Sequence, residues 1–281
     1  MIQATPARRA QLAAAARARR TSMWDTLHAE WTKARTLPGT GWLLLAAVAL
    51  TVIVSSAVAA TVSCPSGHCA EDPAKISLTG IYLGQAVVAV LAVLMISSEY
   101  SAGMIRVTLA AMPRRPVLLA AKAAVVTGVV LAAGAVAVGA SLLAGRFLEP
   151  GNGFTTRHGF VPLSLTHGPT LRAAAGSVLY LALIGLLTLG IATIVRDSAA
   201  ATGAALGILY VPPAIALFLG SDPAWQRWVE RYTPVNAGLA ILNTTGLRNL
   251  VISPWAGLGV LAAWAAGALI LGGLVLRFRD A

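Results

Sequence analysis

The chain has 281 residues, of which 57% are hydrophobic and only 11% are charged. Soluble globular proteins carry about 25% charged residues, so this composition excludes an ordinary water-soluble domain. The formal net charge of +11 does not indicate nucleic-acid binding, because the basic residues lie in short connectors between apolar stretches rather than in one patch. We expect a membrane protein without a nucleic-acid partner.

The first 22 residues are basic and contain five arginines, without an apolar run long enough for a signal peptide. We expect residues 1–22 to be a disordered cytoplasmic tail, unless Met23 is the first residue of the protein. Residues 23–281 then form one transmembrane domain.

Six apolar stretches are each long enough to cross a bilayer, which needs about 20 helical residues. They are helices rather than barrel strands, because a barrel strand has about ten residues of alternating polarity. The sequence therefore predicts an all-α polytopic membrane protein. The predicted spans are Gly41–Val62, Ile76–Ser98, Ala123–Gly145, Ala173–Val195, Ser198–Gly220 and Ile252–Leu276.

The distribution of basic residues predicts a plasma-membrane protein with both termini in the cytoplasm. With that orientation, 14 of the 21 Lys and Arg residues lie on the inner side, in segments 1–40, 99–122, 196–197 and 277–281. This excess agrees with the positive-inside rule.

Several connectors have features of their own. Cys64 and Cys69 share one short loop, which predicts a small disulfide if the loop lies outside the cytosol and free thiols if it lies inside. Only Arg196 and Asp197 separate the fourth and fifth spans, which predicts a tight helical hairpin.

The fifth span and the loop after it also carry signals. Pro212-Pro213 is expected to kink or break the fifth span. The loop 221–251 holds Trp225, Trp228 and Tyr232 among charged residues, a pattern typical of a short amphipathic helix at the membrane interface.

The predicted spans contain no Asp, Glu, Lys, Arg or His. Catalysis or proton transfer within a membrane needs ionisable groups at depth, so we expect no catalytic residue, metal site or cofactor and no enzyme activity in this chain. The lysines are Lys33, Lys75 and Lys122, and none lies in a G-x4-G-K-[ST] loop for ATP. Nucleotide hydrolysis would require a separate subunit.

The segment directly before the first span predicts an amphipathic helix along the inner interface. Its apolar residues recur at helical spacing, and its charged residues occupy a polar side. The apolar set is Trp24, Leu27, Trp31 and Ala34, and the polar side includes Glu30 and Lys33. By itself the pattern fits a membrane anchor as well as a handle for a partner.

A second segment lies between spans two and three. It begins with Ser98–Arg106, continues through Val107–Met112 and ends at a Pro-Arg-Arg-Pro turn at 113–116. Its residues fit equally a short helix that projects into the cytosol and an ordinary charged loop.

These two segments, in this order, resemble the type-2 family of ATP-binding-cassette (ABC) transporter permeases, particularly actinobacterial members. The matching motifs are E-W-T-K-A-R-T at Glu30–Thr36, E-Y-S-A-G-M-I-R at Glu99–Arg106 and P-R-R at Pro113–Arg115. The resemblance extends from about Met23 to the C-terminus.

The resemblance implies the permease subunit of an exporter, which moves an unidentified amphipathic or lipid-like substrate. An elbow helix would precede the first span, and a coupling helix near Glu99–Met112 would dock into a separate ABC ATPase. The working unit would hold two ATPases and a second permease copy or paralogue. The implied elbow residues are Trp24, Glu30, Trp31, Lys33 and Arg35, and the implied coupling residues are Glu99, Tyr100, Gly103, Ile105 and Arg106.

Two other functions stay open. One is a non-transporting membrane scaffold. The other is a secondary transporter driven by sodium, with the ion held by backbone carbonyls of a helix broken near Pro212-Pro213.

Overall fold

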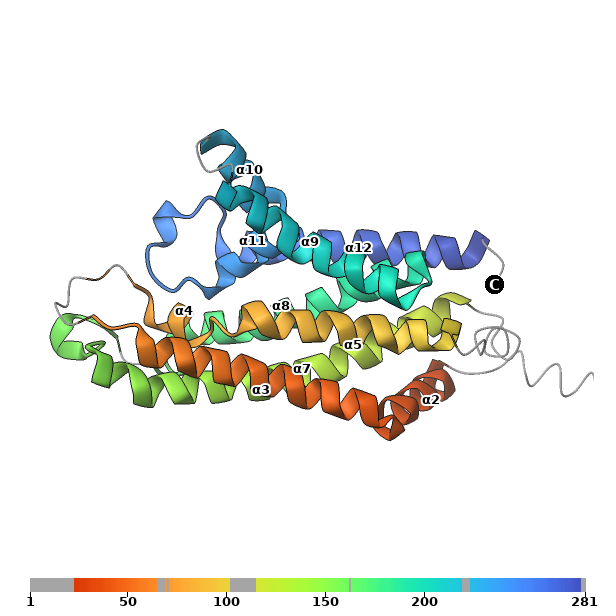
Figure 1. The fold of residues 1–281 in the computed structure, drawn as a ribbon, viewed down its shortest axis with the longest axis horizontal. Helices are drawn as coiled ribbons and strands as arrows, with labels where there is room; N and C mark the ends of the chain where they lie inside the picture. The colour runs from red at the N-terminus through yellow and green to blue at the C-terminus, as the bar shows by residue number, and fades with distance from the viewer. Residues whose placement is uncertain are drawn as a thin grey trace, which may run out of the picture.

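The computed structural model describes residues 23–64, 69, 71–101, 115–161, 163–218 and 223–278, and over these residues it is helical without strands. Six candidate spans are long and apolar enough to cross a membrane, which confirms the predicted fold class. The long helices are α3 (Pro38–Thr61), α5 (Ile81–Ser101), α7 (Arg115–Leu148), α8 (Gly168–Val195), α9 (Ser198–Phe218) and α12 (Pro254–Phe278). Figure 1 shows that most of them run along a common axis while α9 is inclined to it.

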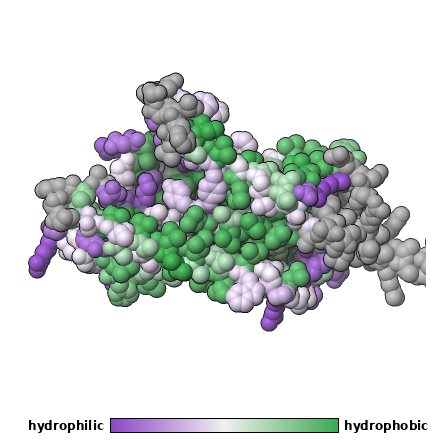
Figure 2. All heavy atoms as spheres, viewed as in Figure 1, coloured by the Kyte–Doolittle hydropathy of each residue, from purple (hydrophilic) through white to green (hydrophobic). Residues whose placement is uncertain are grey.

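Helix α8 lies at the centre of the bundle and packs against α5, α7 and α12. In its apolar window 67% of the residues are buried, against 22% in α3 and in α12. The outer helices turn large apolar side chains such as Ile53 and Ile270 outward, so their outer faces need an apolar surrounding. Figure 2 shows a hydrophobic band over the middle of the molecule, with hydrophilic residues toward both ends. This distribution is that of a multi-pass membrane protein.

The two ends of the bundle differ. The termini end holds α2 (Met23–Thr36) and the last residues of α12, and the opposite loop end holds most of the short elements (Figure 1). The short elements are α4 (Pro73–Ser77), η1 (Glu149–Asn152), η2 (Thr156–His158), α10 (Pro223–Tyr232), α11 (Pro234–Leu239), η3 (Ala240–Leu242) and η4 (Leu247–Asn249).

Two sharp turns at the termini end follow from the local sequence. Leu37 is extended because it precedes Pro38, which begins α3 at a position that needs no amide hydrogen. Arg196 ends α8 with a φ of 63°, and the Asp197 carboxylate accepts a backbone amide in the first turn of α9. The predicted hairpin is therefore confirmed. The Arg196 guanidinium donates to the Val275 carbonyl at 3.2 Å, which ties the hairpin to α12.

Helix α9 runs without interruption through Pro212 and Pro213, so the break that the sequence allowed does not occur. Each proline removes one helical hydrogen bond, but packing against α5, α8 and α11 holds the helix together. Close to the prolines, the Tyr210 hydroxyl donates to the Tyr82 carbonyl at 2.5 Å.

The segment formed by α11 and η3 is buried between α8 and α12. Two glycines allow this close approach. A Cβ atom at Gly257 of α12 would lie 1.9 Å from the Ala237 carbonyl oxygen, and one at Gly176 of α8 would lie 2.0 Å from the Ile241 side chain. The sequence did not predict that this part of the last loop is internal.

We predict that Gly257→Ala destabilises the bundle by about 1–3 kcal/mol, because the new methyl group overlaps the backbone of α11. The matched control is Gly259→Ala on the same helix, where a Cβ atom meets nothing within 4 Å. Thermal unfolding in detergent measures both variants. Equal unfolding temperatures for the two variants would contradict the buried position of α11.

Candidate functional site

Helix α2 is fixed to the bundle by a buried ion pair between Glu30 and Lys122. We call this ion pair, together with the Met95 carbonyl that Lys122 also contacts, the clasp. Glu30 is 3% exposed and Lys122 is 2% exposed, and Lys122 Nζ lies 2.7 Å from Glu30 Oε2. The same ammonium donates to the Met95 carbonyl oxygen of α5 at 3.2 Å. Glu30 Oε1 accepts from Lys33 Nζ at 3.0 Å. Because a buried charge without a partner costs several kcal/mol, each side of the clasp depends on the other.

The clasp corrects two expectations. The sequence placed Glu30 on a polar side of the elbow helix, whereas α2 buries Glu30 together with Thr26 and Ala34. The third candidate span begins at Pro116 rather than Ala123, so it includes Lys122 and is not free of ionisable residues. Counting uncharged residues ends a predicted span at the first lysine. A lysine whose charge is paired can nevertheless lie within the helix.

The other predicted elbow residues lie on the surface of α2. Trp24 is 78% exposed and Trp31 is 47% exposed. Lys33 and Arg35 are also exposed, in the last turn of the helix. Exposed tryptophans beside basic side chains suit the interface between lipid and water.

The predicted coupling residues fall only partly within the described chain. Glu99 and Tyr100 belong to the last turn of α5, where the backbone alone is described. Gly103, Ile105 and Arg106 lie outside the described residues, as does the tail 1–22. The two helices that flank this segment are described: α5 ends at the termini end of the bundle, and α7 begins there (Figure 1). The clasp holds both flanks, through Met95 of α5 and Lys122 of α7.

A polar contact joins two spans inside the bundle. The Tyr180 hydroxyl of α8 donates to Gln85 Oε1 of α5, and both side chains are fully buried. Such hydrogen bonds between membrane helices add about 0.6–2 kcal/mol each. The sequence carried a signal for this contact, because Gln85 is the only amide side chain in the second predicted span.

At the loop end, Asp72 joins α4 to the last loop. Its carboxylate is 6% exposed and accepts from the Thr244 and Thr245 amides and from Thr244 Oγ1 at 2.6 Å. It also caps α4 by accepting from the Ala74 amide at 3.1 Å. One buried carboxylate thus connects segments that are about 170 residues apart in the chain.

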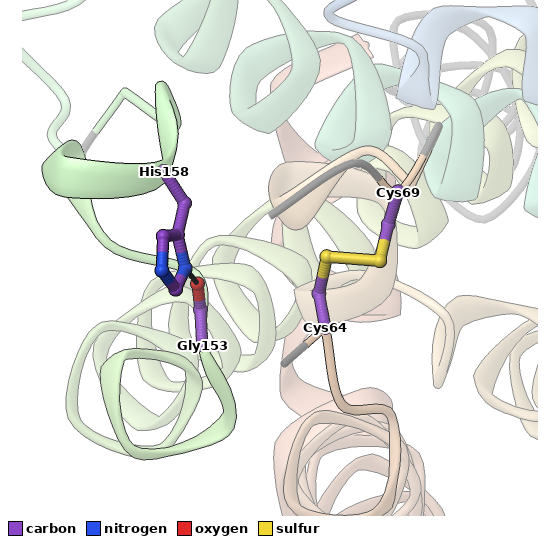
Figure 3. The surroundings of a disulfide bond; sticks show 4 residues. All are labelled: Cys64, Cys69, Gly153 and His158. Carbon is purple, nitrogen blue, oxygen red and sulfur yellow. Dashed lines mark hydrogen bonds between the residues drawn. A yellow bond between two sulfur atoms is a disulfide. The ribbon is translucent and has the colours of Figure 1, made fainter. Parts of the chain in front are cut away.

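A disulfide joins Cys64 to Cys69 at the same end of the bundle, with 6.0 Å between the two Cα atoms (Figure 3). The Cys64 amide donates to the Asn152 carbonyl of η1 at 2.8 Å. Figure 3 also shows His158, whose Nδ1 donates to the Gly153 carbonyl oxygen at 2.7 Å. The loop after α3 is therefore tied to the loop after α7.

Glu149 adds a third buried carboxylate, which accepts from the Ser77 hydroxyl at 2.6 Å. This bond joins α4 to η1. It completes a set of contacts that tie together the three loops of the loop end.

Comparison with protein-family models gives no match to this chain. No curated protein matches it either.

We predict that Lys122→Met lowers the free energy of unfolding by about 3–5 kcal/mol, because it leaves the Glu30 carboxylate buried without its main partner. The double variant Glu30→Gln/Lys122→Met should recover most of this loss. The control Lys33→Met removes a partly exposed cation from the same carboxylate and should cost less than about 1 kcal/mol. Urea unfolding in detergent, followed by circular dichroism, compares the three variants. Equal losses for Lys122→Met and Lys33→Met would contradict the clasp.

We predict that Asp72→Ala destabilises the loop end by at least about 1.5 kcal/mol, because it leaves several backbone and hydroxyl donors without an acceptor. The neighbouring carboxylate Glu71 is exposed, so Glu71→Ala is the matched control and should have little effect. Limited proteolysis measures the change, with faster cleavage of the last loop expected only in Asp72→Ala. Unchanged cleavage in both variants would show that Asp72 does not hold the loop.

Proposed function

We propose that this chain is the membrane-spanning permease subunit of an ABC exporter, driven by ATP hydrolysis on a separate subunit. The clasp is the observation that carries the proposal. It joins α2 to α5 and α7, the two helices that flank the segment 102–114. The motif resemblance assigns partner binding to a coupling helix near Glu99–Met112, which overlaps this segment.

The packing offers a path from that segment into the bundle. Helices α5 and α7 both pack against the central helix α8, which in turn packs against α12. A force applied to the connector between α5 and α7 would therefore be transmitted to packed helices. Packed helices shift as units, because interiors are close-packed and deform little.

The proposed unit contains two permease chains, which are either identical or paralogous, and two ATPases. The proposed substrate is amphipathic or lipid-like. This class suits a pathway lined by apolar helices, with polar groups such as Tyr180 and Gln85 inside the bundle.

The sodium-driven alternative relied on a helix broken at Pro212-Pro213. Since α9 is continuous there, that alternative loses the feature that favoured it. A passive scaffold would need no link between α2 and both flanks of the connector, so the clasp favours the permease.

We predict that an ATPase with a G-x4-G-K-[ST] loop co-purifies with the full-length chain. The chain is purified in mild detergent from the membranes of its own host. Arg106→Glu should reduce the recovered ATPase by about tenfold or more, because charge reversal at a docked ion pair costs several kcal/mol. Quantitative mass spectrometry of the purified material measures the ratio of the two chains.

The matched control is Arg277→Glu, since Arg277 is an exposed cation in the last turn of α12 at the same end. This control should leave the recovered ATPase unchanged. Equal recovery with Arg106→Glu, or no ATPase with the wild-type chain, would contradict the proposal.

A further inference from the structure

A pocket of about 460 Å³ opens at the loop end between α4, α5, α9, α10 and α11. Its volume is in the range of small-molecule sites. Its polar side chains come from four of these elements and from the last loop. They are Lys75, Tyr82, Gln226, Glu230, Asn236 and Asn243.

Helix α10 forms one wall of the pocket and displays an aromatic row on its outside. Trp225 stacks on Trp228 with ring centroids 5.3 Å apart, and Tyr232 follows at 5.8 Å from Trp228. All three are exposed. Tryptophan and tyrosine collect where lipid headgroups meet the hydrocarbon. We therefore expect the pocket beside them to lie at the level of the headgroups.

The pocket is lined by one cation and one anion. Lys75 and Glu230 both line it and are both exposed. Within the part of the chain that the structure describes, neither side chain has a salt-bridge partner. A ligand that fits both must carry a negative group for Lys75 and a positive group for Glu230.

The other residues that line the pocket offer polar contacts and an apolar surface to the uncharged parts of such a ligand. Gln226 and Asn236 offer amide donors and acceptors. Pro213, Leu239 and Ile252 supply an apolar side. A ligand that combines a zwitterionic headgroup with an apolar body is a glycerophospholipid.

The walls are held before any ligand arrives. Asp72 accepts from the Lys75 amide at 3.4 Å and also from the amide of Thr244, next to Asn243. The Tyr82 carbonyl accepts from Tyr210 of α9. A preformed pocket binds with less loss of conformational freedom.

We propose that this pocket binds the headgroup of an aminophospholipid, with Lys75 on the phosphate and Glu230 on the ammonium group. The inference rests on the chain's spanning a bilayer and not on an ATPase partner. Its failure would therefore leave the proposed permease function untouched.

The test uses the full chain, delipidated in a non-ionic detergent, with native mass spectrometry to count bound lipid. Phosphatidylethanolamine and phosphatidylglycerol are titrated separately, because only the first carries an ammonium group. Lys75→Gln should lower the affinity for both lipids by about tenfold, because one charge-assisted contact to the phosphate is lost. Glu230→Gln should weaken phosphatidylethanolamine by about fivefold or more and leave phosphatidylglycerol unchanged.

The matched control is Arg227→Gln, since Arg227 is an exposed α10 residue that does not line the pocket. It should change neither affinity, and circular dichroism should give the same melting for all variants, because the three residues are exposed. Equal affinity of the wild-type chain for both lipids would overturn the proposal, as would equal loss in the control variant. Soluble phosphoethanolamine that binds as tightly as the lipid would overturn the lipid assignment.

Discussion

The buried contact between Glu30 and Lys122 is the interaction on which the arrangement of the termini end depends. Taking two charges out of water is costly, and the cost is offset only where the two groups meet in good geometry. In this placement of α2 the Glu30 carboxylate accepts from Lys122 Nζ, and the same ammonium donates to the Met95 carbonyl of α5. This contact holds α2 against both α5 and α7.

A second carboxylate has the same role at the opposite end. Asp72 gathers amide and hydroxyl donors from α4 and from the last loop. The Cys64 amide and Glu149 tie the first two loops of this end together, through the Asn152 carbonyl and the Ser77 hydroxyl. Peripheral segments at both ends are thus fixed by buried acids with full sets of partners. The apolar middle supplies the spans, and the polar ends set how the connecting segments attach to them.

The sequence was sufficient for most elements that depend on local pattern, although the break at Pro212-Pro213 and the exposed placement of Glu30 were wrong. The six spans, the Arg196–Asp197 hairpin and the helix at Pro223–Tyr232 all follow from apolar length, turn residues or local amphipathicity. The partner of Glu30 could not be found in this way, because Lys122 lies 92 residues away. The isolated lysine in an alanine-rich stretch was the only hint of it. The burial of α11 was missed for the same reason, since it depends on gaps left by Gly176 and Gly257 on two distant helices.

We propose that this chain provides the membrane passage while another polypeptide hydrolyses the nucleotide. ATP hydrolysis tests it most directly, measured on the same preparation before and after accompanying proteins are stripped away. The account predicts turnover by material purified from the host membrane and none by the isolated chain. ATP turnover by the isolated chain, or none in the intact preparation, would contradict it.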